Sequence, residues 1–176
     1  MMCTLSVDSI SVSSFMTTKI VTDTQDQNIS SVSKKMDENN IGSVIIVDNE
    51  RDKKAVGIIT ERDVVRIIGK LQPWLLSTPL SALMSKPLIT IRSNASLRDG
   101  LQTMYSKNIR RLPVISEEKK GEIVGIITDK VIFKMLMKNQ NLVQSLLADN
   151  MISDGMETVR EQFAEYWFGN TLIHRK

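Results

Sequence analysis

Apolar positions along this chain follow two spacings, and the same succession of spacings occurs twice. In some segments apolar residues recur every three or four positions, as at Ile29, Val32 and Met36, which is the spacing of one face of a helix. In others, apolar and β-branched residues run almost continuously, as at residues 43–47 and 55–59, which is typical of strands covered on both faces. The pattern therefore predicts short helices packed on buried strands.

The whole pattern is an internal repeat, because residues 12–70 align with residues 80–138 without a gap. The pentapeptide Val-Gly-Ile-Ile-Thr occurs at residues 56–60 and again at residues 124–128. An internal repeat constrains the architecture before any local prediction is made. Each copy has only about 60 residues, which is marginal for an independent core, so we expect the two copies to pack against each other.

Each copy reads as strand, helix, strand, strand, helix, after a short leading segment that ends in Met16 or Met84. In the first copy we expect strands at residues 19–22, 43–47 and 55–59, and helices from Ile29 and over residues 60–69. In the second copy we expect strands at residues 87–90, 112–115 and 123–127, and helices from Leu97 and over residues 128–139. The sequence thus predicts an α/β (α+β) fold with units at residues 12–70, 80–140 and 141–176.

Two segments outside the repeat carry large apolar side chains. The connection between the copies contains Trp74, Leu75 and Leu76, which we expect to be buried against a copy or a neighbouring subunit. The C-terminal extension has an apolar stripe at helical spacing, which predicts a helix that docks on the module, on a second subunit or on a partner. The stripe consists of Ile152, Met156, Val159, Phe163, Tyr166 and Trp167.

Composition narrows the class of protein. The chain has 176 residues, with 41% hydrophobic and 24% charged residues, which is typical of a globular protein. A net charge of +3 does not indicate a dedicated nucleic-acid binder. A single cysteine, no apolar run of about 18 residues and no signal-peptide pattern predict a cytoplasmic protein without a membrane span.

Two such copies, each with Gly-Ile-Ile-Thr before a helix, resemble a tandem pair of CBS domains, the Bateman module. The resemblance covers about residues 12–138, and residues 57–63 carry the family's characteristic segment in complete form. Residues 40–47 and 108–114 resemble the family's first hairpin strand. The resemblance implies two copies packed through their sheets about a pseudo-twofold axis, ligands in clefts between them, and pairing of modules into flat homodimers. The implied ligands are adenine nucleotides and, in some members, S-adenosylmethionine.

The first copy carries the stronger candidate site. Thr60 lies where a strand meets a helix N-terminus, which favours anions, and the Asp63 carboxylate suits the paired hydroxyl donors of a ribose. The resemblance assigns these tasks to Thr60 and Asp63, with adenine against the backbone near Thr22 and residues 41–45. The predicted nucleotide-binding residues are Thr22, Ile41, Gly42, Ser43, Ile45, Thr60, Arg62, Asp63, Arg110 and Arg111.

Two features of this site have a second interpretation. Thr60 and Asp63 also match a capping box, which would contribute about 1 kcal/mol without any ligand. Arg110 and Arg111 align with Gly42 and Ser43, and they form either a solvated turn or a phosphate clamp. We favour the clamp, with the small residues of the first copy leaving room for a base.

The second copy departs from the pattern, since Val131 stands where the first copy has Asp63. Valine accepts no hydrogen bond from a ribose hydroxyl, so we expect this second cleft to bind nucleotide weakly or not at all. Its residues are Thr90, Pro113, Thr128, Asp129 and Lys130.

No catalytic or metal-binding arrangement is predicted. The lone His174 and lone Cys3 have no partner ligands in the sequence, and a P-loop is missing. We therefore predict a stand-alone regulatory module, not an enzyme, that binds AMP, ADP or ATP and signals to an unknown effector protein. The alternatives are an S-adenosylmethionine-binding module, a ligand-free scaffold acting through its C-terminal helix and, less favoured, a nucleic-acid binder.

Overall fold

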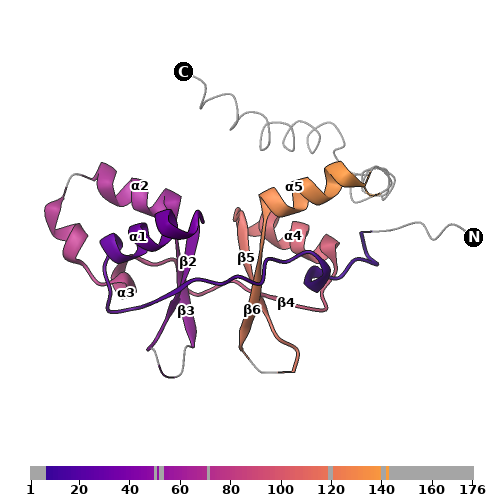
Figure 1. Cartoon of the computed structure of the whole chain (residues 1–176), viewed down its shortest axis with the longest axis horizontal. Coiled ribbons are helices and arrows are strands. Elements are labelled where there is room, and N and C mark those ends of the chain that lie inside the picture. The colour runs from indigo at the N-terminus through magenta and orange to yellow at the C-terminus, as the bar shows by residue number, and fades with distance from the viewer. Residues whose placement is uncertain are drawn as a thin grey trace, which may run out of the picture.

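The computed structural model describes residues 7–49, 51, 54–70, 72–118, 121–139 and 142. Two similar halves lie side by side with their hairpins toward the centre (Figure 1). The first half contains β1 (Thr22–Thr24), α1 (Ile29–Asn39), β2 (Ser43–Val47), β3 (Ala55–Thr60) and α2 (Glu61–Gly69). The second contains β4 (Ile91–Arg92), α4 (Leu97–Lys107), β5 (Arg111–Ile115), β6 (Ile123–Thr128) and α5 (Asp129–Lys138). The short helices are η1 (Val12–Ser14), η2 (Pro73–Ser77) and α3 (Leu80–Leu83).

Each half holds a three-stranded sheet of the same topology. The orders are β1-β2-β3 and β4-β5-β6, with a parallel outer pair and an antiparallel hairpin in each. The hairpin register shifts at Ile46/Val47 and at the equivalent Val114/Ile115. The predicted β-α-β-β-α order, given twice, is confirmed. The predicted C-terminal helical extension lies outside the described residues, apart from the buried Leu142.

Helices α1 and α4 begin at the predicted Ile29 and Leu97, and each is closed by a cap residue at both ends. Asn28 caps α1 by accepting hydrogen bonds from Ser30 and Ser31, and Ser96 caps α4. Both helices end at an asparagine in the left-handed conformation, Asn40 (φ 51°) and Asn108 (φ 50°). Asparagine tolerates this conformation, which directs the chain into the following strand.

The leading segment of each copy packs on the other copy. Val12 is buried in the core of the second half, whereas Leu80 is buried in the core of the first half. The two repeats thus exchange their leading segments. Backbone hydrogen bonds continue this exchange just after each segment, where Thr17 pairs with Ile126 and Ser85 pairs with Ile58. Figure 1 shows the N-terminal chain running across from the second half to the first. Each hydrophobic core is therefore completed by residues from the other repeat.

This exchange explains why the first strands begin later than predicted. Strands were expected at residues 19–22 and 87–90, but pairing starts at Thr22 and at Ile91. The residues upstream follow Thr17 and Ser85, which are bonded to the opposite copy. They span the distance between the halves and so cannot lie along β2 or β5 over their full length.

Gly57 and Gly125 allow the exchanged segments to approach the sheets. A Cβ atom at Gly57 would lie 2.5 Å from Met84 Sδ and 3.0 Å from the carbonyl oxygen of Ser85. At Gly125 it would lie 2.5 Å from Met16 Sδ. The close neighbour of each glycine is thus another part of the chain, which is one of the two uses expected for a glycine within a strand.

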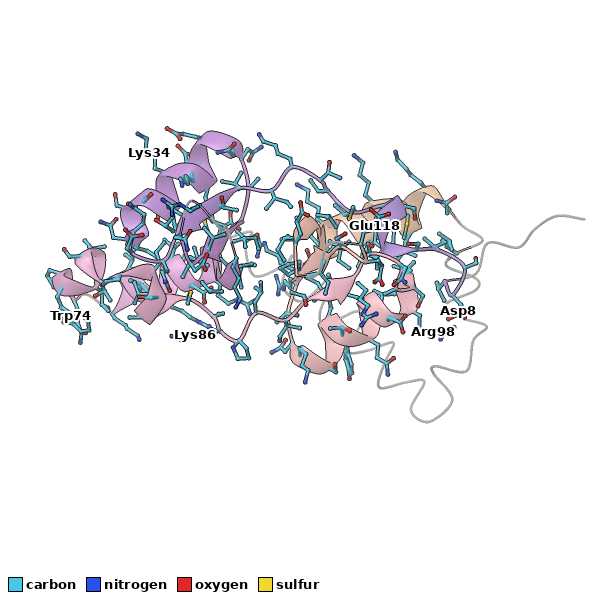
Figure 2. All side chains as sticks on the ribbon, turned by 90° about the horizontal axis from the view of Figure 1, so that it is seen from below. Asp8, Lys34, Trp74, Lys86, Arg98 and Glu118 are labelled. Carbon is cyan, nitrogen blue, oxygen red and sulfur yellow. The ribbon has the colours of Figure 1, made fainter. Side chains whose placement is uncertain are left out.

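Of Trp74, Leu75 and Leu76, only Leu75 is buried against a copy as expected, and burial of the other two against a neighbouring subunit stays a prediction. Leu75 is 5% exposed, but Trp74 and Leu76 are 63% and 50% exposed. The segment forms the short helix η2, whose three residues per turn direct only one of three successive side chains inward. Figure 2 shows Trp74 at the far end of the first half.

Replacing Gly57 by alanine is expected to destabilise the protein by about 1–3 kcal/mol, because the new methyl group overpacks against Met84 and the Ser85 backbone. Gly69→Ala is the control, since that glycine ends α2 with nothing within 4 Å of the added atom. Urea unfolding of both variants measures the difference. Equal midpoints for Gly57→Ala and wild type would contradict the close approach.

Candidate functional site

The candidate site of the first half starts where β3 meets α2. Thr60 is the N-cap of α2, and its Oγ1 accepts a hydrogen bond from the Asp63 backbone N–H at 3.4 Å. In return, Asp63 Oδ2 accepts from the Thr60 backbone N–H at 2.9 Å and from its hydroxyl at 2.7 Å. The capping box is therefore formed in full.

The capping box also fixes the direction of the Asp63 carboxylate. Both bonds from Thr60 use Oδ2, and within the part of the chain that the structure describes nothing hydrogen-bonds to Oδ1. Asp63 is half-buried in the first turn of α2. Its second oxygen can therefore accept hydrogen bonds from a bound molecule while the cap stays intact.

The equivalent junction in the second half is capped from one side only. Thr128 Oγ1 accepts from the Val131 backbone N–H at 3.2 Å, but valine returns no bond. The first helical residues of the two halves are held alike, because Glu61 N donates to Gly42 O and Asp129 N donates to Arg110 O, both at 3.1 Å. The two junctions thus have the same backbone hydrogen bonds, and they differ in the Asp63 carboxylate, which the second half lacks.

The structure places four predicted residues of the first half on one sheet. Thr22 pairs with Ile45 across β1 and β2, and Ser43 pairs with Thr60 across β2 and β3. Ile41 packs against the core of this half, and its backbone N–H donates to Met36 O at 3.0 Å. Its backbone N–H is therefore already used, and the backbone carbonyl of Ile41 is the polar group left to contact a ligand.

The predicted residues of the second half lie at places equivalent to those of the first. Pro113 is buried in β5 opposite Ile126, and Thr128 pairs with Arg111. Thr90 precedes β4, while Lys130 lies exposed on α5. Arg62 is likewise exposed on α2.

The two arginines of the second half approach different acids. Arg111 crosses to the first half, where its Nη2 lies 3.1 Å from Glu61 Oε2. Arg110 stays within its own half, with Nε 4.0 Å from Asp129 Oδ2. Their side chains are 24% and 31% exposed, so neither arginine extends fully into solvent.

Gly42 makes room for the Arg111 crossing. A Cβ atom at Gly42 would overlap the Arg111 guanidinium and lie 2.5 Å from Glu61 Oε2. Sequence reasoning expected space at Gly42 for a base, whereas the structure fills it with a side chain from the other repeat. Glu61 was missed, although its position between Thr60 and Asp63 is a signal that the sequence offers.

A buried ion pair, also missed, fixes the edge strand of the first half. Asp23 is 5% exposed and contacts Lys35 Nζ at 2.9 Å and Ser31 Oγ at 2.6 Å. Lys35 Nζ also donates to the Thr22 carbonyl at 2.8 Å. The repeat alignment contained a signal, because the position equivalent to Asp23 is the apolar Ile91. This network holds Thr22 in place relative to α1.

The described residues form neither a metal site nor a membrane-spanning helix. Within that part of the chain, no group of three or more His, Cys, Asp or Glu side chains could hold a metal ion. None of the helices formed by those residues has the length and apolar character needed to span a membrane. Cys3 and His174 lie outside the described residues.

Comparison with known proteins identifies the repeat. The sequence model of the CBS domain family matches residues 12–70 and 80–138. An uncharacterized protein from Methanopyrus kandleri is 34% identical over 123 residues, which are 68% of this chain and 59% of that protein. The chain thus matches only part of the length of this relative.

Solved structures share the architecture. The CBS domain pair of protein MJ0100, in complex with 5′-methylthioadenosine and S-adenosyl-L-methionine, has a TM-score of 0.65 at 22% identity, covering 73% of this chain and 97% of that one. CBSX2 in complex with AMP has a TM-score of 0.61 at 19% identity, covering 73% and 96%. These likenesses establish the fold. With both repeats matched and the paired architecture shared, the chain belongs to the CBS domain family as a tandem CBS pair.

Proposed function

We propose that this protein is a regulatory module that binds an adenine nucleotide, AMP, ADP or ATP, where the two CBS repeats meet. CBS-domain pairs are generally regulatory and not catalytic, and related pairs bind adenosine ligands. The observation that carries the proposal is the Asp63 carboxylate. Thr60 holds one of its oxygens and leaves the other available, and an arginine from the opposite repeat reaches Glu61 in the same helical turn.

Each part of a nucleotide has a counterpart at this junction. The available Asp63 oxygen suits the ribose hydroxyl groups, and the N-terminal end of α2 favours negative charge. Adenine would lie along the backbone near Thr22 and Ile45, where the Lys35 contact keeps the edge strand in place. Arg110 and Arg111 would bind phosphate, because a guanidinium matches the geometry of phosphate oxygens.

The same reasoning assigns one strong site to each chain. The second half repeats the strand and helix of the first, but Val131 replaces the carboxylate, and both arginines belong to this half, Arg111 as the first residue of β5 and Arg110 just before it. A ribose placed there would lose its acceptor. We therefore expect the second cleft, with Thr90, Pro113, Thr128, Asp129 and Lys130, to bind nucleotide weakly or not at all.

S-adenosylmethionine is the second candidate ligand, since the pair from protein MJ0100 holds it together with 5′-methylthioadenosine. Its adenosine part would use Asp63 in the same way. However, its sulfonium group is positively charged, and the two arginines disfavour a cation at that end of the site. The charge of the junction therefore favours a phosphate-bearing ligand.

Binding would act on a separate effector protein in the cytoplasm. A ligand held by both Asp63 and Arg111 bridges the two repeats, so it stabilises the arrangement in which these groups converge. A partner that prefers one arrangement would sense the nucleotide through this shift. The apolar stripe predicted for residues 152–167 is a candidate contact for such a partner, and it is also the basis of the ligand-free scaffold alternative.

A second copy of the chain would cover the outer face of α2 and α5. Val65 and Ile68 on α2, and Phe133 and Met137 on α5, are exposed apolar side chains. The two helices lie along the same edge of the molecule (Figure 1). Val65 and Phe133 are equivalent in the repeat, and an exposed apolar face of this kind on each of two copies could form the self-complementary contact of a homodimer.

The combined substitution Ile68→Glu and Met137→Glu is expected to convert the homodimer to a monomer, because it would bury two charges in an apolar contact. Sedimentation velocity measures the change. Leu76→Glu, which alters an exposed leucine of η2 and neither of the two helices of this face, should leave the dimer unchanged. Identical sedimentation of the double variant and wild type would contradict this interface.

Adenine nucleotides are expected to raise the stability of the wild type, by about 2.7 kcal/mol at 100 times the dissociation constant. A thermal-shift panel of AMP, ADP, ATP and S-adenosylmethionine measures this gain. Asp63→Ala should abolish the response, because the ribose loses its acceptor.

The control for the panel is Asp99→Ala. Asp99 forms the same capping box with Ser96 on α4, with bonds of 2.7 and 3.0 Å, so its loss should cost a similar cap energy of about 1 kcal/mol. We expect this variant to keep the full response to ligand. A response that is equal in both variants would reduce Asp63 to a helix cap, and no response in wild type would favour the scaffold alternative.

A further inference from the structure

Arg111 and Glu61 form an ion pair between the repeats at the proposed phosphate end of the site. The Arg111 guanidinium reaches from the start of β5 to the first turn of α2, where Nη2 lies 3.1 Å from Glu61 Oε2. Glu61 directly follows Thr60 and lies two residues before Asp63. The arginine is therefore held at the first turn of α2, the turn that also carries Asp63.

The repeat alignment shows that this contact is specific to one side of the junction. Gly42 is equivalent to Arg110, and Glu61 is equivalent to Asp129. The position equivalent to Arg111 is Ser43, so the first half has no arginine to make the reverse contact with Asp129, and Gly42 leaves the room that Arg111 needs to reach Glu61. Arg110 meanwhile faces the acid of its own half, Asp129.

The ion pair can be replaced by a contact between Arg111 and another anion. The Glu61 side chain is 65% exposed, and a single exposed ion pair contributes little to stability. A phosphate carries more charge than a carboxylate and offers three oxygen acceptors, and a guanidinium can bind two of them at once. A phosphate at this position would therefore compete well with Glu61 for Arg111.

We propose that Glu61 is an internal competitor for Arg111, which a phosphate of the bound adenine nucleotide displaces. This inference rests on the proposed function and adds a specificity-determining residue to it. Glu61 then lowers the affinity for ligands with a phosphate and leaves the affinity for the adenosine part unchanged. Phosphate binding also breaks an ion pair between the repeats, which couples the charge of the ligand to their relative position.

The test measures dissociation constants of AMP and adenosine by calorimetry for wild type and Glu61→Gln. Glu61→Gln is expected to bind AMP about two- to fivefold more tightly, as the loss of an exposed competing ion pair allows, and to bind adenosine unchanged. Arg111→Ala should raise the dissociation constant of AMP about tenfold or more. In the Arg111→Ala background, adding Glu61→Gln should no longer change the AMP affinity.

Glu38→Gln is the matched control, because it removes the same charge from an exposed ion pair, Lys34–Glu38 on α1, that takes no part in the proposed site. We expect it to leave AMP binding within about twofold of wild type. Equal tightening by Glu38→Gln and Glu61→Gln, or tightening that persists without Arg111, would show a general charge effect and overturn the inference. Thermal unfolding of Glu61→Gln without ligand should match wild type, because the pair is exposed.

The experiment separates failure of this inference from failure of the proposed function. AMP binding that depends on Asp63, with a ratio of AMP to adenosine affinity that Glu61→Gln does not change, overturns the role of Glu61 alone. Flat titrations of wild type with both ligands overturn the proposed function and this inference with it.

Discussion

The exchange of leading segments between the two repeats is the constraint on which the rest of the structure depends. Val12 completes the core of the second half and Leu80 completes the core of the first, so neither repeat buries its apolar surface without the other. Gly57 and Gly125 permit the close contact with Met84 and the Met16 segment. Because each half is tied to the other in this way, the start of β5 is held near the first turn of α2, and Arg111 can reach Glu61.

A nearly symmetric backbone here carries an asymmetric set of charges. Both halves have the same sheet order, the same register shift and the same backbone bond to the first residue of α2 or α5. The differences lie at single positions: Asp63 against Val131, Gly42 against Arg110, and the buried Asp23 against Ile91. The repeat thus supplies the scaffold, and substitutions at single positions place Asp63 and the buried Asp23 in the first half only. This asymmetry is the physical basis for proposing one strong nucleotide site per chain.

The sequence predicted what depends on local spacing. The helices, the hairpins and the Thr60–Asp63 capping box follow from periodicity and cap residues a few positions apart, and the structure shows them where they were expected. It could not predict the late start of β1, the exposed Trp74 or the Arg111–Glu61 pair, because these depend on contacts between residues far apart in the chain. Comparing the two repeats position by position, as with Asp23 and Ile91, would have found part of the missing information.

The central claim is that nucleotide binds at the half that carries Asp63 and not at the half that carries Val131. Calorimetric titration of the wild-type protein with AMP tests it most directly, because the stoichiometry counts the occupied sites. The account predicts a single AMP per chain, with binding lost in Asp63→Ala. Two equivalent AMP molecules per chain, or one that persists in Asp63→Ala, would contradict it.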